Sequence, residues 1–160
     1  MRLEESEAEV KVSIVLADDH RVVREGLRML LEVKGGATVV AEAGDVVGAR
    51  RALREHNPDV LVLDVNMPGE SGLSALSRLR EEFPETAIVV LTMQADPQLA
   101  REALREGARA YVLKEGARAL LLEAVKAATA GRTYLDPLLG RPARGEAGRP
   151  RTARGRLDRA

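Results

Sequence analysis

Five short apolar runs, rich in β-branched residues, recur along this 160-residue chain, and helix-length segments separate them. The runs occupy residues 12–17, 37–42, 59–64, 86–92 and 110–114. Nearly continuous apolar character over such short lengths is typical of strands that are covered on both faces of a parallel sheet. The alternation therefore predicts an α/β fold, a three-layer sandwich whose parallel strands are joined by right-handed crossovers.

The segments between the runs carry helix signals of their own. The first has apolar residues at three-to-four spacing and ends at the Gly-Gly pair 35–36. Ser71 is placed to cap the third helix, and Asp96 to cap the fourth. The segment 45–56 is the least regular, because Gly48 lowers its helix propensity. We expect a helix in each of these segments.

Composition narrows the class of protein. Apolar residues make up 45% of the chain and aromatic residues only 2%, so the core must be built from Val, Leu, Ile and Ala. The absence of cysteine excludes disulfides and thiolate metal sites and is compatible with a reducing cytoplasm. No apolar run approaches membrane-spanning length. The 25 basic and 25 acidic residues balance, which argues against a protein that coats nucleic acid. We expect a cytoplasmic protein with no membrane partner.

The pattern divides the chain into three regions. Residues 1–10 form an acidic segment that we expect to be disordered, and residues 11–137 form one folded domain. Residues 138–160 resemble a disordered linker or truncated tail rich in Arg, Gly and Pro. Within it, residues 141–160 hold seven Arg against two acids, a net charge of +5, with too few apolar residues for a core. Any DNA affinity of this tail should be electrostatic and indifferent to sequence.

Polar side chains stand at the ends of four of the five runs. The residues are Asp18 and Asp19 after the first run, Asp64 at the end of the third, Thr92 at the end of the fourth and Lys114 at the end of the fifth. Ligands of open parallel sheets bind beyond the carboxyl ends of the strands, near the point where the strand order reverses. In the flavodoxin-like order 2-1-3-4-5, strands one and three are neighbours. We therefore expect the three aspartates to converge.

Three close carboxylates repel one another unless a cation lies between them. A set of oxygen ligands without His or Cys suits Mg²⁺, which keeps several waters and accepts a phosphate oxygen. Lys114 would add a positive charge and Thr92 a hydroxyl, and these groups together stabilise a phosphoryl group in transfer. Aspartate can accept such a group covalently. Asp64, the central acid, is the predicted nucleophile.

At this point the chain resembles the receiver domain of two-component response regulators, in particular the NarL/FixJ subfamily with LuxR-type output. The resemblance covers roughly residues 11–137. It rests on the stretches LADDHRVVREGLRMLL, PDVLVLDVNMPGESGL, IVVLTM and GARAYVLK, followed by LLLEAVKAATAGRTYLDP. Each motif alone is weak. Their order, with separations of 45, 28 and 22 residues between the second aspartate, the central aspartate, the threonine and the lysine, is specific.

The resemblance implies a phosphorylation site with a bound metal. By this resemblance Asp64 accepts phosphate from a sensor histidine kinase. Asp19, Asp64 and the backbone carbonyl of Asn66 would bind Mg²⁺ directly, with Asp18 acting partly through water. The protein would catalyse only its own phosphoryl transfer and dephosphorylation, and would not otherwise be an enzyme.

The resemblance also implies a switch and an output. Thr92 and Lys114 would bind the phosphoryl oxygens, and Tyr111 would swing inward on activation, so that Thr92 and Tyr111 form the switch. Residues 11–137 would be the receiver domain, with homodimerisation as a possible response to phosphorylation. Control of transcription would require a DNA-binding output domain, and the chain lacks the Leu-Thr-x-Arg-Glu opening of such a domain.

Several alternatives stand beside this hypothesis. A stand-alone receiver would act by protein contact only. A haloacid-dehalogenase-type hydrolase also uses a strand-end aspartate and Mg²⁺, but it needs an acid where this chain has Asn66. Asp18 and Asp19 could instead cap the first helix. His20 has no Ser or Cys partner in the sequence and is expected to be a loop residue.

Overall fold

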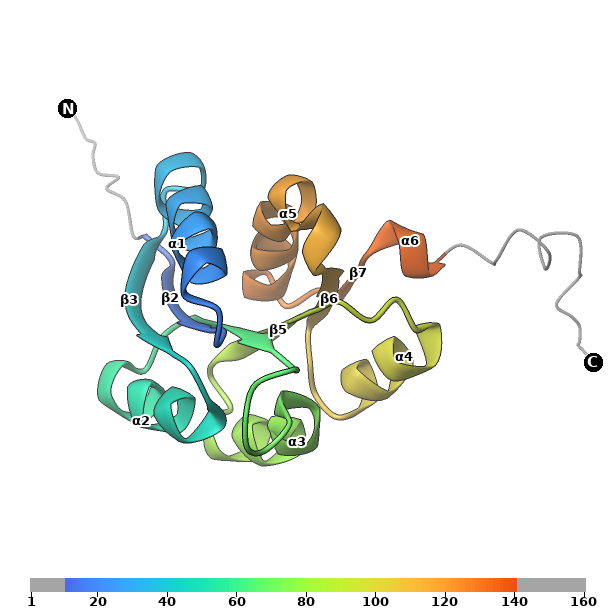
Figure 1. Cartoon of the computed structure of the whole chain (residues 1–160), viewed down its shortest axis with the longest axis horizontal. Helices are drawn as coiled ribbons and strands as arrows, with labels where there is room; N and C mark the ends of the chain where they lie inside the picture. The colour runs from blue at the N-terminus through green and yellow to red at the C-terminus, as the bar shows by residue number, and fades with distance from the viewer. Residues whose placement is uncertain (1–10, 141–160) are drawn as a thin grey trace, which may run out of the picture.

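The computed structural model describes residues 11–140, which form a parallel sheet between two layers of helices (Figure 1). The strands are β2 (Ser13–Ala17), β3 (Thr38–Ala43), β4 (Val60–Asp64), β5 (Ala87–Thr92), β6 (Ala110–Leu113) and β7 (Tyr134–Leu135). Their order in the sheet is β3-β2-β4-β5-β6-β7, and every pair is parallel. The predicted flavodoxin-like order is confirmed, and β7 adds a sixth strand that the sequence did not reveal.

The helices lie on both faces of the sheet. They are α1 (Arg21–Met29) with a π-helical continuation η1 (Leu30–Lys34), α2 (Val46–His56), α3 (Gly72–Glu82), α4 (Pro97–Arg105), the 3₁₀ turn η2 (Lys114–Gly116), α5 (Ala117–Thr129) and α6 (Pro137–Gly140). Helices α1 and α5 cover one face, and α2, α3 and α4 cover the other (Figure 1). Within residues 11–140, no helix combines the length and the apolar character needed to cross a bilayer.

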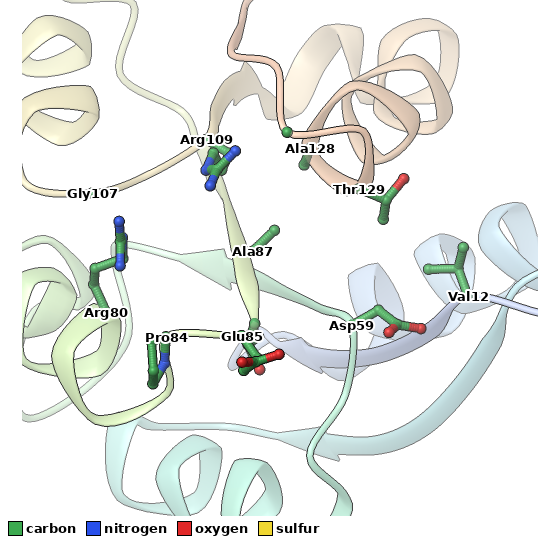
Figure 2. Close-up of a pocket in the computed structure, with 12 residues that line it drawn as sticks. Val12, Asp59, Arg80, Pro84, Glu85, Ala87, Gly107, Arg109, Ala128 and Thr129 are labelled. Carbon is green, nitrogen blue, oxygen red and sulfur yellow. The ribbon is translucent and has the colours of Figure 1, made fainter.

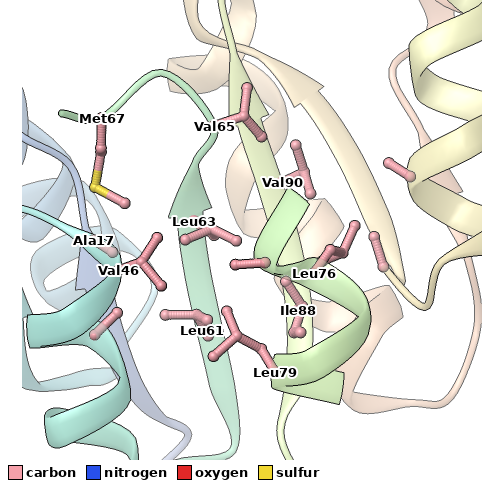
Figure 3. Packing of buried hydrophobic residues seen from close by; sticks show 14 of the residues in the cluster. Ala17, Val46, Leu61, Leu63, Val65, Met67, Leu76, Leu79, Ile88 and Val90 are labelled. Carbon is pink, nitrogen blue, oxygen red and sulfur yellow. The ribbon is translucent and has the colours of Figure 1, made fainter. Parts of the chain in front are cut away.

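The alternation of side chains along each strand divides the core into two layers. On β4, Leu61 and Leu63 pack with the residues of α2 and α3, as Figure 3 shows. Val60 and Val62 point to the opposite face and pack with α1 and α5. All five residues of β4 are buried. Because both faces of the strand are covered, its sequence is continuously apolar until it reaches Asp64 at the edge.

Side-chain caps begin three of the helices, at Ser71 and Asp96 as predicted and also at Asp45. Asp45 accepts a hydrogen bond from the Gly48 N–H at 2.8 Å, and Ser71 and Asp96 cap α3 and α4 in the same way. The irregular segment 45–56 is therefore a helix. Gly48 contributes to its start, since its N–H is the donor that the Asp45 carboxylate binds.

The fold continues beyond the predicted boundary at residue 137. Tyr134 and Leu135 form β7 beside β6, and Leu139 of α6 is buried in the core. Residues 138–140 were predicted to belong to the tail, and this boundary is wrong because Leu139 packs against the fold. The predicted disorder of residues 1–10 and of residues 141–160 concerns segments outside the described residues.

Candidate functional site

Three aspartates meet at the carboxyl ends of the central strands. Strands β2 and β4 are direct neighbours, with Ala17 opposite Leu63, so the residues that follow them reach the same point. Carboxylate oxygens of Asp18, Asp19 and Asp64 lie within 4.8 Å of one another and of a ring nitrogen of His20. Asp18 and Asp64 are fully buried. The predicted convergence of the three aspartates is present in the structure.

Lys114 joins this cluster from the end of β6. Its Nζ lies 3.0 Å from Asp18 Oδ2 and 3.1 Å from Asp64 Oδ2, and its side chain is only 12% exposed. Burial favours the neutral amine, but hydrogen bonds with the two carboxylates outweigh this and raise the pKa of Lys114 above its usual value. The lysine therefore carries its charge at neutral pH and lies between two buried carboxyl groups.

Backbone N–H groups orient two of the carboxylates. The Asn66 N–H donates to Asp64 Oδ1 at 2.9 Å, which leaves Oδ2 toward Lys114. The His20 N–H donates to Asp18 Oδ1 at 2.8 Å, and His20 is the N-cap residue of α1. Asp18 thus binds the backbone of His20 with one oxygen and faces the cluster with the other. The capping alternative is not observed, because His20 occupies the N-cap position of α1 and makes no side-chain cap hydrogen bond.

The donor set fits a hard divalent cation. Asp18 Oδ2 is buried against the single ammonium of Lys114, and Asp19 Oδ1 is buried and accepts no hydrogen bond within the described residues. Such oxygens are costly to bury unless a cation compensates them. Asp19 keeps 27% of its side chain exposed, which leaves solvent access for metal-bound waters. Oxygen ligands with open access to water match the preferences of Mg²⁺.

Thr92 and Tyr111 lie on the neighbouring strands β5 and β6. Thr92 ends β5 and is fully buried, and its Oγ1 accepts a hydrogen bond from the Gln94 N–H at 3.1 Å. Tyr111 on β6 is 1% exposed, and its hydroxyl donates to the Gln94 carbonyl at 3.1 Å. Burial raises the pKa of the Tyr111 phenol. Both side chains thus hold Gln94, and the Tyr111 ring lies inward in this structure.

The sequence did not predict two contacts with the aspartates, one from His20 and one from Arg24. His20 Nδ1 lies 3.2 Å from Asp19 Oδ1, although the imidazole is 67% exposed. Arg24 donates from Nη1 to the Asp18 carbonyl at 2.6 Å. His20 follows the two aspartates directly, so its nearness could have been anticipated. The Arg24 contact is one helical turn further on and has no recognisable signal in a single sequence.

A hollow of the described fold lies away from the acidic cluster. It has a volume of about 390 Å³ and is lined by residues at the amino-terminal ends of the strands, as Figure 2 shows. Asp59 precedes β4, Ala87 begins β5 and Arg109 precedes β6. Since the aspartates stand at the carboxyl ends of the same strands, this pocket is no part of the candidate site.

The strand order and the acidic edge define a receiver-type α/β domain. Residues 14–126 match the family model of the response regulator receiver domain, and the chain belongs to that family. The oxygen regulatory protein NreC of Staphylococcus carnosus (strain TM300) is 45% identical over 127 residues, which cover 79% of this chain and 58% of NreC. The NreC of Staphylococcus haemolyticus (strain JCSC1435) is 47% identical over 126 residues, 78% of this chain and 58% of the relative. The chain therefore spans somewhat over half the length of these relatives.

Solved structures agree with this family. A two-component response regulator of the LuxR family from Aurantimonas sp. SI85-9A1 has a TM-score of 0.77 and 38% identity, covering 82% of this chain and 94% of that one. The signal receiver domain of the putative response regulator NarL from Mycobacterium tuberculosis has a TM-score of 0.71 and 34% identity, covering 76% and 98%. Proteins of this family are signalling proteins and not conventional enzymes, and their receiver domains generally bind Mg²⁺ at an acidic pocket.

Proposed function

We propose that the chain is a phosphorylation-activated receiver that accepts a phosphoryl group on Asp64 from a sensor histidine kinase in the cytoplasm. One observation carries the proposal. Asp64 is a fully buried carboxylate that is held between a backbone N–H and a lysine ammonium, at the edge of the sheet where ligands bind. Burying a strand-terminal carboxylate costs desolvation energy even when it is paired, which favours a functional reason for its position.

In the proposed reaction, a carboxylate oxygen of Asp64 attacks the phosphorus of a phosphohistidine. The new O–P bond forms as the P–N bond breaks, and the imidazole nitrogen leaves with the electron pair and takes up a proton. Lys114, which pairs with the Asp64 carboxylate beforehand, can then pair with a phosphoryl oxygen. Asp18, Asp19 and Asp64, together with the Asn66 carbonyl that the family resemblance adds, would hold Mg²⁺, and the cation would neutralise charge on the transferred group.

The switch is proposed to run through Thr92, Gln94 and Tyr111. The Thr92 hydroxyl and the Tyr111 hydroxyl both bind the backbone of Gln94, so a phosphoryl oxygen that attracts Thr92 would disturb the contact of Tyr111 as well. Moving a two-state population from 1:99 to 99:1 requires about 5.5 kcal/mol. Two or three charge-assisted hydrogen bonds to the phosphoryl group, at roughly 1.5–3 kcal/mol each, supply energy of this size.

The output of the switch is proposed to be transcription control. The relatives extend well beyond the part that this chain matches, which is consistent with an output domain in the full-length proteins. A related structure contains two RcsB dimers bound to two parallel DNAs. Homodimerisation on phosphorylation and DNA binding through an output domain are therefore the proposed consequences. A stand-alone receiver that acts by protein contact is the second candidate.

Phosphorylation by a small donor tests the chemistry directly. Acetyl phosphate with Mg²⁺ should add one phosphoryl group to the protein, detected by intact mass, and removal of Mg²⁺ with a chelator should stop the reaction. Asp64→Asn should abolish the mass increase. Asp59→Asn is a matched control, because Asp59 lies at the opposite end of β4 and binds the Ser13 N–H. A phosphoryl group that still appears on Asp64→Asn would overturn the assignment.

A further inference from the structure

We propose that Arg24 is a positioning residue of the phosphorylation site, which fixes the backbone of Asp18 and thereby the Asp18–Asp19 pair. The inference rests on the proposed function, since it concerns the metal affinity and phosphorylation rate of that site. Arg24 lies on α1, outside the set of strand-end residues. It reaches the site through the carbonyl of Asp18 and not through a side chain of the cluster.

The guanidinium of Arg24 bridges two elements. Its Nη1 donates to the Asp18 carbonyl at 2.6 Å, and its Nε donates to Glu42 Oε1 on β3 at 2.9 Å. Both partners of the ion pair are mostly buried, with 20% of Arg24 and 24% of Glu42 exposed. A planar guanidinium holds its N–H groups in a fixed fork, so binding Glu42 with one nitrogen sets the direction of the other. The ion pair with Glu42 therefore orients the Arg24 guanidinium toward the Asp18 carbonyl.

The Asp18 backbone is held from both sides. Its N–H donates to the Ala43 carbonyl at 2.9 Å, and its carbonyl accepts from Arg24. Ala43 follows Glu42 directly in β3, so one edge strand supplies both supports. Without Arg24 the carbonyl would lose its charge-assisted bond, and the peptide between Asp18 and Asp19 could rotate. Asp19 Oδ1, which has no well-aligned hydrogen bond among the described residues, depends on that peptide for its position.

Glu42 is a stable anchor because two arginines share it. Arg28 Nη1 lies 2.6 Å from Glu42 Oε2, on the other side of the carboxylate from Arg24. Burial raises the pKa of Glu42, but the hydrogen bonds from Arg28 and Arg24 outweigh it, and the pKa lies below its usual value. The anchor is therefore ionised at neutral pH.

Arg28 provides the matched control. It belongs to the same helix, carries the same charge and binds the same carboxylate, but its remaining contacts are with Glu32 and the Val39 carbonyl. A purely structural role of the ion pairs would make Arg24→Gln and Arg28→Gln behave alike. A positioning role would give the two variants different effects, because Arg24, and not Arg28, donates a hydrogen bond to Asp18.

The sign of the effect on metal binding separates positioning from charge. A guanidinium near three carboxylates repels an incoming cation, so loss of its charge alone should tighten Mg²⁺ binding. Loss of its hydrogen bond to the loop should weaken binding, because outer groups that orient metal ligands typically contribute 10–100-fold in affinity. The two effects oppose each other, and the measured direction shows which one dominates.

Calorimetric titration with Mg²⁺ alone, followed by phosphorylation with acetyl phosphate, tests the inference on the full chain. Arg24→Gln should weaken Mg²⁺ binding about tenfold and slow phosphorylation at fixed Mg²⁺. Arg28→Gln should remain within about twofold of the parent. Arg24→Lys, which keeps the charge but has no fork, should fall between the parent and Arg24→Gln, and it replaces Arg24→Gln in the test if that variant does not fold.

The outcomes distinguish this inference from the proposed function. Unchanged or tighter Mg²⁺ binding by Arg24→Gln, or an equal loss in Arg28→Gln, would overturn the positioning role and leave the phosphorylation site intact. Phosphorylation of Asp64→Asn would overturn the site itself. If Arg24→Gln does not fold, parent-like Mg²⁺ affinity in Arg24→Lys would likewise count against positioning.

Discussion

Replacement of Lys114 by Met would remove the ammonium that separates two buried carboxylates. Lys114 Nζ contacts Asp18 Oδ2 at 3.0 Å and Asp64 Oδ2 at 3.1 Å, and both acids are fully buried. Removing one partner of a buried ion pair typically costs 3–5 kcal/mol, because the remaining charge is left uncompensated. Methionine retains most of the apolar stem of lysine, so little packing is lost. We expect the free energy of unfolding to fall by about 3 kcal/mol and the melting temperature by roughly 10 °C.

Urea unfolding in the presence of a chelator measures this loss. Circular dichroism is the suitable probe, because the chain has no Trp and only two Tyr. The matched control is Lys126→Met, since Lys126 lies exposed on α5. Its effect should stay within about 0.5 kcal/mol. Equal unfolding midpoints for the two variants would refute the electrostatic account of the cluster.

The pH dependence of the same comparison follows from the raised pKa of Lys114. A group whose pKa is higher in the folded state contributes stability below its unfolded pKa, and this contribution is lost as the pH rises through the folded value. The advantage of the parent over Lys114→Met should therefore be constant from neutral pH to about pH 10 and should shrink only above it. Mg²⁺ should stabilise Lys114→Met more than the parent, because the cation then compensates carboxylates that have lost their lysine.

Three further substitutions probe the surroundings of the site. Gly72→Ala places a Cβ 2.8 Å from the Asp64 carbonyl, so thermal unfolding should show a loss of about 1–3 kcal/mol, and parent-like stability would contradict the close approach. Asp136→Ala removes the buried acceptor of the Leu113 N–H, so urea unfolding should show that the free energy of unfolding falls by about 1–3 kcal/mol. An unchanged midpoint would mean that this N–H finds another partner. Thr92→Ala should still accept phosphate but should dimerise less on phosphorylation, as measured by light scattering after gel filtration; dimerisation equal to the parent would exclude the proposed relay.

The sequence predicted the strands and most helix starts because their causes are local. Side chains that alternate across a covered sheet leave a run of apolar residues, and an N-cap lies within three residues of the N–H that it binds. Ser71 and Asp96 were predicted on this basis, and Asp45 is a local cap of the same kind that the structure adds. The convergence of the aspartates was also predictable, since parallel strands place their carboxyl ends at one edge.

The end of the first helix shows where local patterns fail. The sequence predicted one regular helix up to the Gly-Gly pair. In the structure the α-helix ends at Met29 and continues as the π-helix η1 from Leu30. A Cβ on Gly35 would come within 2.5 Å of the Leu122 side chain on α5. The turn is therefore fitted to a neighbour that lies far along the chain, and the three-to-four spacing carries no trace of that contact.

Strand β7 was also missed in the sequence because it depends on contacts between residues that are distant along the chain. Tyr134 and Leu135 form only two residues of β7, too short for a periodic signal, and they pair with β6 because α5 returns the chain to that edge. Asp136 then accepts a hydrogen bond from the Leu113 N–H at 3.0 Å and is itself buried. A carboxylate before a proline looks like a turn residue in the sequence. Its role as the buried acceptor of the Leu113 N–H depends on tertiary structure.

The charges of the site explain why metal binding and phosphorylation should be coupled. Asp18, Asp19 and Asp64 contribute three negative charges and Lys114 one positive charge, a net of −2 when all are ionised. An anionic phosphoryl donor is repelled by such a cluster, and one lysine cannot reverse that repulsion. A divalent cation brings the sum to zero before the donor arrives. The strand order gathers these acids at one edge of the sheet, and we expect a divalent cation from solution to supply the missing charge.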